Sequence, residues 1–172
     1  MIREWLTKTS TPVRIALGVV LLGGMLSLLL IFFAVTRPDP YPLASGDSVT
    51  TWSFKGALAD GGKGETATKE EILKLKGLLG KSTNDYEVLV GIASQFVLLG
   101  DGKSAYLYLS KAVESNPQKG LAYFNMGHLM EQLGAVETAR SAYTQAVEAE
   151  PASTVYRSYL VVFTSSYPKR KS

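Results

Sequence analysis

The sequence predicts an all-α protein, with a single membrane-spanning helix near the N-terminus and a short solenoid of about six helices in its second half. Two features support this prediction. Residues 15–35 form a run of 21 residues without a charged side chain, and residues 86–119 share a pattern with residues 120–153 at a separation of 34 positions. A third feature limits the chemistry: the chain of 172 residues has one histidine and no cysteine, which excludes disulfides and zinc sites built from thiolates or several histidines.

The apolar run is predicted to cross a membrane as an uncleaved anchor. At about 1.5 Å per residue, a helix of this length spans roughly 30 Å, the thickness of the hydrocarbon core of a bilayer. A cleavable signal peptide is the alternative, but its apolar part is typically about 7–15 residues long and precedes a small-x-small site that is not evident here. Gly23 and Ser27 lie four residues apart on one face of this helix. This spacing suits either packing against another membrane helix or the ordinary glycine content of such helices.

Charges beside the apolar run predict its orientation. Residues 1–14 contain three basic residues and one acidic residue, whereas Arg37 is the single basic residue close to the other end of the run. Basic flanks prefer the cytoplasmic side of a membrane. We therefore expect the N-terminus to lie in the cytoplasm and the second half of the chain to lie outside it. In a bacterium this means a periplasmic domain anchored in the inner (cytoplasmic) membrane.

Residues 36–66 are predicted to form a linker. Prolines open this segment and glycines close it, and proline and glycine at this density disfavour regular structure. Trp52 and Phe54 are unusual in a free linker. Docking on the chain's own helical domain, on the lipid interface or on a partner protein would each explain them.

The second half of the chain contains an internal repeat. Seven positions are identical between residues 86–119 and 120–153 without a gap, in the pairs Leu99 and Leu133, Gly100 and Gly134, Ala105 and Ala139, Ala112 and Ala146, Val113 and Val147, Glu114 and Glu148, and Pro117 and Pro151. The glycines suit the turn after a first helix, the alanines suit a close crossing with a second helix, and the prolines suit the end of that helix. The spacing therefore predicts two helix–turn–helix units.

This pattern resembles the tetratricopeptide repeat. In residues 86–119 the positions of the family pattern fall on Leu89, Ile92, Ala93, Phe96, Gly100, Ala105, Leu109, Ala112 and Pro117. In residues 120–153 they fall on Tyr123, Met126, Gly127, Met130, Gly134, Ala139, Tyr143, Ala146 and Pro151. Leu109 and Met130 depart from the aromatic residues of the family pattern but keep their bulk. The resemblance implies helix pairs that stack side by side, so that each unit covers the apolar face of its neighbour.

Flanking helices are expected to complete a domain over residues 67–166. Thr68 and Glu71 suggest a capping box at the start of a first flanking helix, and the apolar residues from Val155 to Phe163 suggest a last one. Two units are near the lower limit for a stable array, which favours a bound partner or a homo-oligomer. Residues 167–172 form a basic tail.

The sequence predicts that the protein is not an enzyme and that it binds no cofactor and no metal. With one histidine and no cysteine, no Ser–His, Cys–His or multi-histidine arrangement can form. No glycine-rich phosphate loop has the required spacing. Residues 36–168 contain 12 basic and 14 acidic residues, so there is no excess of basic charge to bind nucleic acid.

The resemblance places a ligand groove along the first helix of each unit. The groove positions of the family correspond to Glu87, Val90, Gly91, Ser94 and Val97 in the first unit, to Leu121, Phe124, Asn125, His128 and Glu131 in the second, and to Ser158 and Tyr159 in the last helix. Packing between units is the alternative for each residue, and it is stronger for Val90 and Val97 than for Phe124 and His128. One subclass of the family grips a C-terminal carboxylate with basic residues and asparagines, and only Asn125 fits that pattern. A mostly apolar groove suits an extended or helical peptide instead.

From these features we expect a membrane-tethered module for protein–protein interaction, which acts as a scaffold or assembly factor for a membrane or envelope complex. The alternative is a permanent small accessory subunit held by its membrane helix and linker. A narrower version rests on architecture alone: the chain resembles anchored periplasmic repeat proteins that present apocytochromes during c-type cytochrome maturation.

Overall fold

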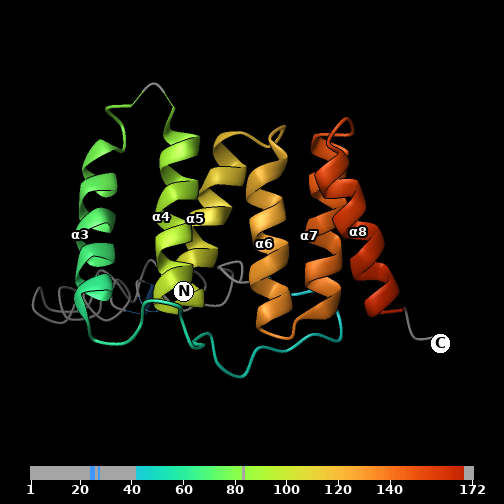
Figure 1. The fold of residues 1–172 in the computed structure, drawn as a ribbon, viewed down its shortest axis with the longest axis horizontal. Coiled ribbons are helices and arrows are strands. Elements are labelled where there is room, and N and C mark those ends of the chain that lie inside the picture. Colours follow the sequence, from blue (N-terminus) through green and yellow to red (C-terminus); the bar gives the residue numbers. More distant parts are fainter. Residues whose placement is uncertain (1–23, 26, 28–41, 83, 169–172) are drawn as a thin grey trace, which may run out of the picture. The chain divides into compact units, whose positions relative to one another are not determined.

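The computed structural model describes residues 24, 25, 27, 42–82 and 84–168. The chain divides into two units, Met1–Pro40 and Tyr41–Ser172, and the fold below is that of the second unit. Its described residues form six α-helices and no regular strand (Figure 1). The all-α class predicted from the sequence is therefore confirmed for the described part of the chain.

The predicted membrane span falls largely outside the described residues. Of residues 15–35, only Gly24, Met25 and Ser27 are described, and they are helical. Among all described residues, no helix is both long enough and apolar enough to cross a bilayer. The span, the flank at residues 1–14 and the packing role of Gly23 therefore stay predictions from the sequence.

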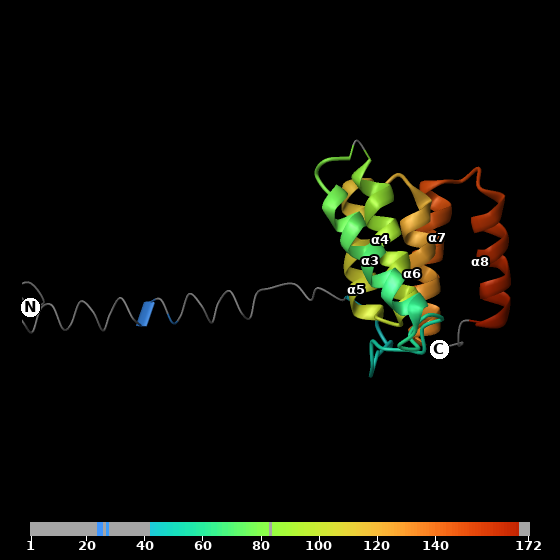
Figure 2. The ribbon, with the colours of Figure 1, turned by 60° about the vertical axis from the view of Figure 1, so that its left-hand side comes forward.

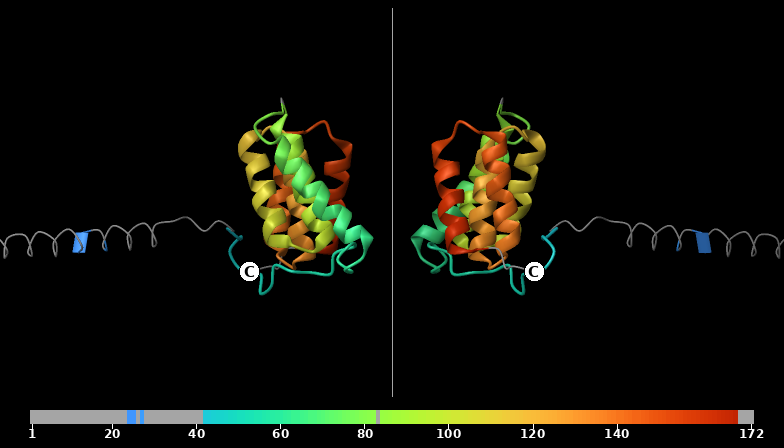
Figure 3. Two further views of the ribbon diagram at one scale, coloured as in Figure 1. Left: turned by 90° about the vertical axis from the view of Figure 1, so that its left-hand side faces the viewer. Right: turned by 90° about the vertical axis from the view of Figure 1, so that its right-hand side faces the viewer.

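The six helices form an array in which each helix packs against the next one along the chain. They are α3 (Lys63–Leu78), α4 (Asp85–Leu99), α5 (Gly102–Ser115), α6 (Gly120–Gln132), α7 (Val136–Ala149) and α8 (Thr154–Ser166). Helices α3 and α8 lie at the two ends of the array (Figure 1), and a turn of the view brings α3 to the front (Figure 2). Viewed from its end, α5 and α8 lie on opposite sides of the array (Figure 3). Helix α4 also contacts α6 directly, so these two helices are neighbours although α5 separates them in the sequence.

Equivalent positions of the two repeats occupy equivalent places in the helix pairs α4–α5 and α6–α7. Gly100 and Gly134 have positive φ angles of 74° and 78° in the turns between the paired helices, a conformation that glycine adopts without strain. Helices α5 and α7 begin at Gly102 and Val136, which are 34 positions apart, as the repeat predicts. The recurring alanines are fully buried, at Ala105, Ala112, Ala139 and Ala146.

Ala139 provides a test of this close packing, because its side chain is fully buried in the core. Ala139→Leu is expected to lower the free energy of unfolding by about 1–3 kcal/mol, since the larger side chain must displace packed neighbours. Ala67→Leu makes the same change at an exposed position of α3 and serves as the control. Urea titrations followed by circular dichroism measure both variants. Equal midpoints would show that the repeat register is assigned wrongly.

Helix α3 begins earlier than predicted, and the expected capping box at Thr68 is wrong. Thr68 lies inside the helix, where it is buried and its hydroxyl donates to the Gly64 carbonyl oxygen at 2.8 Å. The helix starts instead at Lys63, within the segment predicted to be linker. Glu65 in its first turn accepts a hydrogen bond from the Gly61 N–H at 2.7 Å. A carboxylate beside the free N–H groups of the helix start stabilises this earlier beginning.

Residues 42–58 form an irregular strap along the lower ends of the helices in Figure 1, from α7 toward α3. The strap bonds to the turn between α4 and α5. The Phe54 N–H donates to the Gly100 carbonyl oxygen at 3.1 Å, and the Gly102 N–H donates to the Trp52 carbonyl oxygen at 2.8 Å. The side chains of Trp52 and Phe54 also pack against the core. Of the three docking surfaces considered for Trp52 and Phe54, the one found in the structure is the chain's own helical domain.

Asp47 of the strap caps α7. Its carboxylate accepts hydrogen bonds from the Glu137 N–H at 3.3 Å and from the N–H and hydroxyl of Thr138 at 2.6 and 2.7 Å. These N–H groups belong to the first turn of α7, where a helix leaves its own donors without partners. Ala135 at the N-cap position has no side chain that could accept them. Asp47, which precedes Thr138 by 91 positions, therefore takes the place of the usual N-cap side chain.

Candidate functional site

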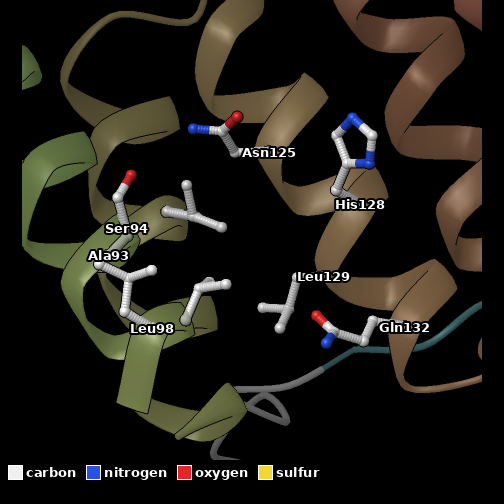
Figure 4. Close-up of a pocket in the computed structure, with 9 residues that line it drawn as sticks. Ala93, Ser94, Leu98, Asn125, His128, Leu129 and Gln132 are labelled. Carbon is white, nitrogen blue, oxygen red and sulfur yellow. The ribbon is translucent and has the colours of Figure 1, made fainter. Parts of the chain in front are cut away.

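A cavity of about 290 Å³ opens between α4, α5 and α6 (Figure 4). The residues that line it are Ala93, Ser94, Val97 and Leu98 from α4, Leu109 from α5, and Asn125, His128, Leu129 and Gln132 from α6. Its volume is at the lower end of the range for ligand pockets, about 300–1,000 Å³. It therefore suits one large side chain or a similar ligand group.

The floor of the cavity is apolar and its rim is polar. Ala93, Leu109 and Leu129 are almost fully buried, whereas Asn125 is half-buried and Gln132 is exposed. Within the described part of the chain, neither of these two amides makes a hydrogen bond. An amide offers both a donor and an acceptor, so the rim can bond to a peptide backbone while an apolar side chain fills the floor.

Aromatic side chains of α6, α7 and α8 meet on one surface, which we name the aromatic wall: Phe124 and His128 from α6, Tyr143 from α7, and Tyr156 and Tyr159 from α8. The ring centroid of Phe124 lies 4.6 Å from that of His128, and 4.9, 5.3 and 5.7 Å from those of Tyr156, Tyr159 and Tyr143. These distances are typical of stabilising aromatic pairs. Tyr143 is buried, and the other four residues keep part of their surface exposed. His128 lines the cavity as well, so the wall and the cavity adjoin.

Glu131 binds two tyrosines of the wall. Its Oε2 accepts hydrogen bonds from the hydroxyls of Tyr143 and Tyr159, at 2.8 and 3.2 Å. Burial, assisted by the hydrogen bond to Glu131, raises the pKa of the Tyr143 hydroxyl, which keeps this group protonated as a donor. Among the described residues, no lysine or arginine forms an ion pair with Glu131.

The ring of His128 packs against the rings of Phe124 and Tyr159, whose centroids are 4.6 and 4.5 Å away. Loss of water around the ring lowers the pKa of His128 below its ordinary value of 6.5, and the charge of Glu131 opposes this shift. His128 is therefore neutral at pH 7 and adds no positive charge to the surface.

The lowered pKa of His128 predicts a pH dependence of stability. The folded state binds this proton less tightly than the unfolded state does, so stability decreases as the pH falls through 6.5 toward the folded-state pKa. We expect the midpoint urea concentration to decrease in this window, and His128→Gln to remove that part of the decrease. Because the chain has one histidine, NMR of its ring reports the pKa directly. A value at or above 6.5 would contradict this prediction.

Most of the predicted groove residues lie at the cavity or at the aromatic wall. Those that line the cavity are Ser94, Val97, Asn125 and His128. Those at the wall are Phe124, His128, Glu131 and Tyr159. The structure thus places residues from both repeats and from α8 on one continuous surface.

Other predicted groove residues lie apart from this surface. Val90 is buried in the core, as expected if it packs between helices and does not bind a ligand. Leu121 is half-buried and packs against the same core. Glu87 is exposed and forms an ion pair with Lys119 at 2.8 Å. Gly91 faces α3, because a Cβ there would lie 3.5 Å from a leucine side chain of that helix.

Sequence reasoning missed Gln132 and much of the cavity floor. Gln132 lies seven residues after Asn125 on the same face of α6, so extending the helical periodicity by one more turn would have found it. Leu98 and Leu109 lie on different helices, and only the packing of α5 against α4 brings them to one cavity.

The polar groups at the cavity are the hydroxyl of Ser94, the amides of Asn125 and Gln132, and the imidazole of His128. The Ser94 hydroxyl donates to the Val90 carbonyl oxygen at 3.0 Å, within its own helix. Across the described ranges, no three acidic or histidine side chains gather where they could hold a metal ion. Apolar contact and amide hydrogen bonds are the interactions that the cavity offers a ligand.

In comparisons with known proteins, no family model matches this chain and no curated protein sequence matches it.

Proposed function

We propose that the chain is a membrane-tethered module for protein–protein interaction, which binds a segment of a partner protein in the cavity between α4, α5 and α6. The observation that supports this most directly is that Ser94, Asn125 and His128 line one cavity with an apolar floor. They come from different repeats, so a bound segment would cross from one unit to the next. The Asn125 amide can bond to its backbone, while one apolar side chain enters the cavity.

We further propose that the array consists of two tetratricopeptide-like units, α4–α5 and α6–α7, with α3 and α8 as flanking helices. The equivalent glycine turns and the buried alanines of the two pairs support this assignment. Stacked units of this kind form a concave surface that binds extended ligands. The first helices of the two units, α4 and α6, border the cavity.

The apolar run at residues 15–35 would hold this binding surface at a membrane, where the protein would act as a scaffold or assembly factor for a membrane or envelope complex. Its flanking charges favour a periplasmic position for the helical array.

Single cysteines at Ser10 and Ser153 test the periplasmic position, because the chain has no cysteine of its own. They should react with membrane-impermeant reagents from opposite sides. Reaction of both from the cytoplasmic side would exclude the periplasmic position.

Ser94→Tyr tests whether the cavity binds the partner. Ser94 is half-buried and lines the cavity, so a tyrosine there would occupy the space for the ligand. With a photo-crosslinking residue at Gln132 on the rim, the wild-type chain should capture a partner in its own membranes. Ser94→Tyr should reduce the yield about tenfold or more, as expected when a central contact is lost.

Ser141→Tyr makes the same change at an exposed position of α7 and is the matched control. Circular dichroism should show that both variants remain folded. Equal yields from the two folded variants would place the binding site elsewhere on the molecule.

A second candidate function, a permanent subunit of a larger membrane complex, is favoured by the exposed side of α8. Val155, Val161 and Val162 are 62%, 64% and 62% exposed there, although the end of a repeat array normally presents a polar face to water. A permanent neighbour would cover these valines. Purification in mild detergent distinguishes the two functions, because a permanent subunit elutes in a stoichiometric complex and a transient factor elutes only with assembly intermediates.

A further inference from the structure

Glu131 is a half-buried carboxylate that lies beside the aromatic wall. Its Oε2 accepts the hydroxyls of Tyr143 and Tyr159, and its Oε1 makes no hydrogen bond within the described part of the chain. No lysine or arginine of that part forms an ion pair with this half-buried carboxylate. A carboxylate that is partly removed from water is stabilised when a positive group pairs with it.

The aromatic rings around Glu131 also favour a positively charged ligand. Phe124, Tyr156 and Tyr159 are half-buried, so part of each side chain remains open to a ligand. The face of an aromatic ring attracts a lysine ammonium or an arginine guanidinium group. His128 is mainly neutral at pH 7, because the neighbouring rings remove water from its imidazole and lower its pKa, and so it repels a cation little.

We propose that Glu131 and the aromatic wall form a second subsite, which takes a lysine or arginine side chain of the same partner segment that fills the cavity. This inference rests on the proposed function, because the cavity must bind a peptide before its neighbour can contribute. The two subsites adjoin, since His128 lines the cavity and contacts the rings of Phe124 and Tyr159.

The short separation of the subsites defines a recognition pattern, because Glu131 follows the cavity residue His128 by three positions on α6, and such side chains lie about 5–6 Å apart. Side chains two positions apart on an extended peptide lie about 7 Å apart on the same side. Side chains three or four positions apart on a helical peptide lie about 5–6 Å apart. The partner segment therefore has a large apolar residue for the cavity and a basic residue two to four positions away.

Charge complementarity selects this occupant over the others. An acidic side chain at the second subsite would face the negative charge of Glu131. An apolar side chain would cover the Oε1 atom of Glu131 without giving it a hydrogen-bond partner, which is unfavourable. A basic side chain satisfies both the carboxylate and the aromatic rings.

Selection of peptides on the intact chain tests the proposal. The full chain, immobilised in detergent, is screened against a phage-displayed library of random peptides, in parallel with Glu131→Gln and Glu148→Gln. Glutamine at position 131 can still accept the tyrosine hydroxyls, so the wall should remain folded. Glu148 is exposed on α7, outside both subsites, and its substitution removes the same charge.

The wild-type chain and Glu148→Gln should enrich peptides with an apolar residue and a basic residue two to four positions apart. Glu131→Gln should enrich the apolar residue alone. For a synthetic copy of an enriched peptide, replacing its basic residue with glutamine should weaken binding to the wild-type chain about tenfold, and to Glu131→Gln less than about twofold.

Enrichment of apolar peptides without a basic residue by the wild-type chain would overturn this inference and leave the proposed function standing. Failure to enrich any peptide would overturn the proposed function, and the inference with it. The substitution within the peptide alters no residue of the protein, so it decides between these outcomes even if Glu131→Gln does not fold.

Discussion

Trp52→Ala is expected to lower the free energy of unfolding of the helical array by about 2–4 kcal/mol, somewhat less than the loss of a fully buried tryptophan. Trp52 is half-buried, packs against the core and lies edge-to-face with Tyr106 at 5.5 Å between ring centroids. Its carbonyl oxygen also accepts the Gly102 N–H at the start of α5. Loosening the strap should therefore weaken the start of that helix as well.

Two further substitutions make this result specific to the strap. Asp47→Ala removes the cap of α7 and should lower the free energy of unfolding by about 1 kcal/mol. Lys55→Ala changes an exposed strap residue and should stay within about 0.5 kcal/mol of the wild-type chain. Urea titrations of the full chain in detergent, followed by circular dichroism, measure all three. If Trp52→Ala unfolds at the same midpoint as Lys55→Ala, residues 42–58 behave as a free linker and not as part of the fold.

Phe124→Ala is expected to lower the free energy of unfolding by about 2–4 kcal/mol, because this partly buried side chain contacts four other rings of the aromatic wall. The repeat pattern leaves position 124 open for a ligand. The structure shows that Tyr156 and Tyr159 of α8 already pack against this residue. Phe124 is therefore a poor choice for testing binding alone, whereas Ser94 at the cavity separates binding from folding.

Phe124→Leu separates the bulk of this side chain from its ring contacts. It keeps most of the apolar volume and should lower the free energy of unfolding by about 1 kcal/mol. The same urea titrations place it between the wild-type chain and Phe124→Ala. Identical midpoints for the three chains would mean that Phe124 serves only a ligand.

The surface that we propose binds a partner could be predicted in part from the sequence. Ser94, Asn125 and His128 follow from the resemblance to the tetratricopeptide repeat, whose groove positions correspond to these residues in the register of the two units. The aromatic wall could not be predicted in this way. It requires α8 to bring Tyr156 and Tyr159 to Phe124, and the periodicity of one helix does not state where another helix crosses it.

By itself, the sequence determined the all-α class, the helix pairs and their glycine turns at Gly100 and Gly134. These features depend on residues within a few positions of one another, so local patterns are enough to predict them. Only the tertiary structure decided that residues 42–58 belong to the helical array. Asp47 and Thr138 are 91 positions apart, and the free N–H groups of a helix donate to any carboxylate that packing brings to them. No local sequence pattern predicts the hydrogen bond between Asp47 and Thr138, because it forms only when the strap and α7 meet in the folded chain.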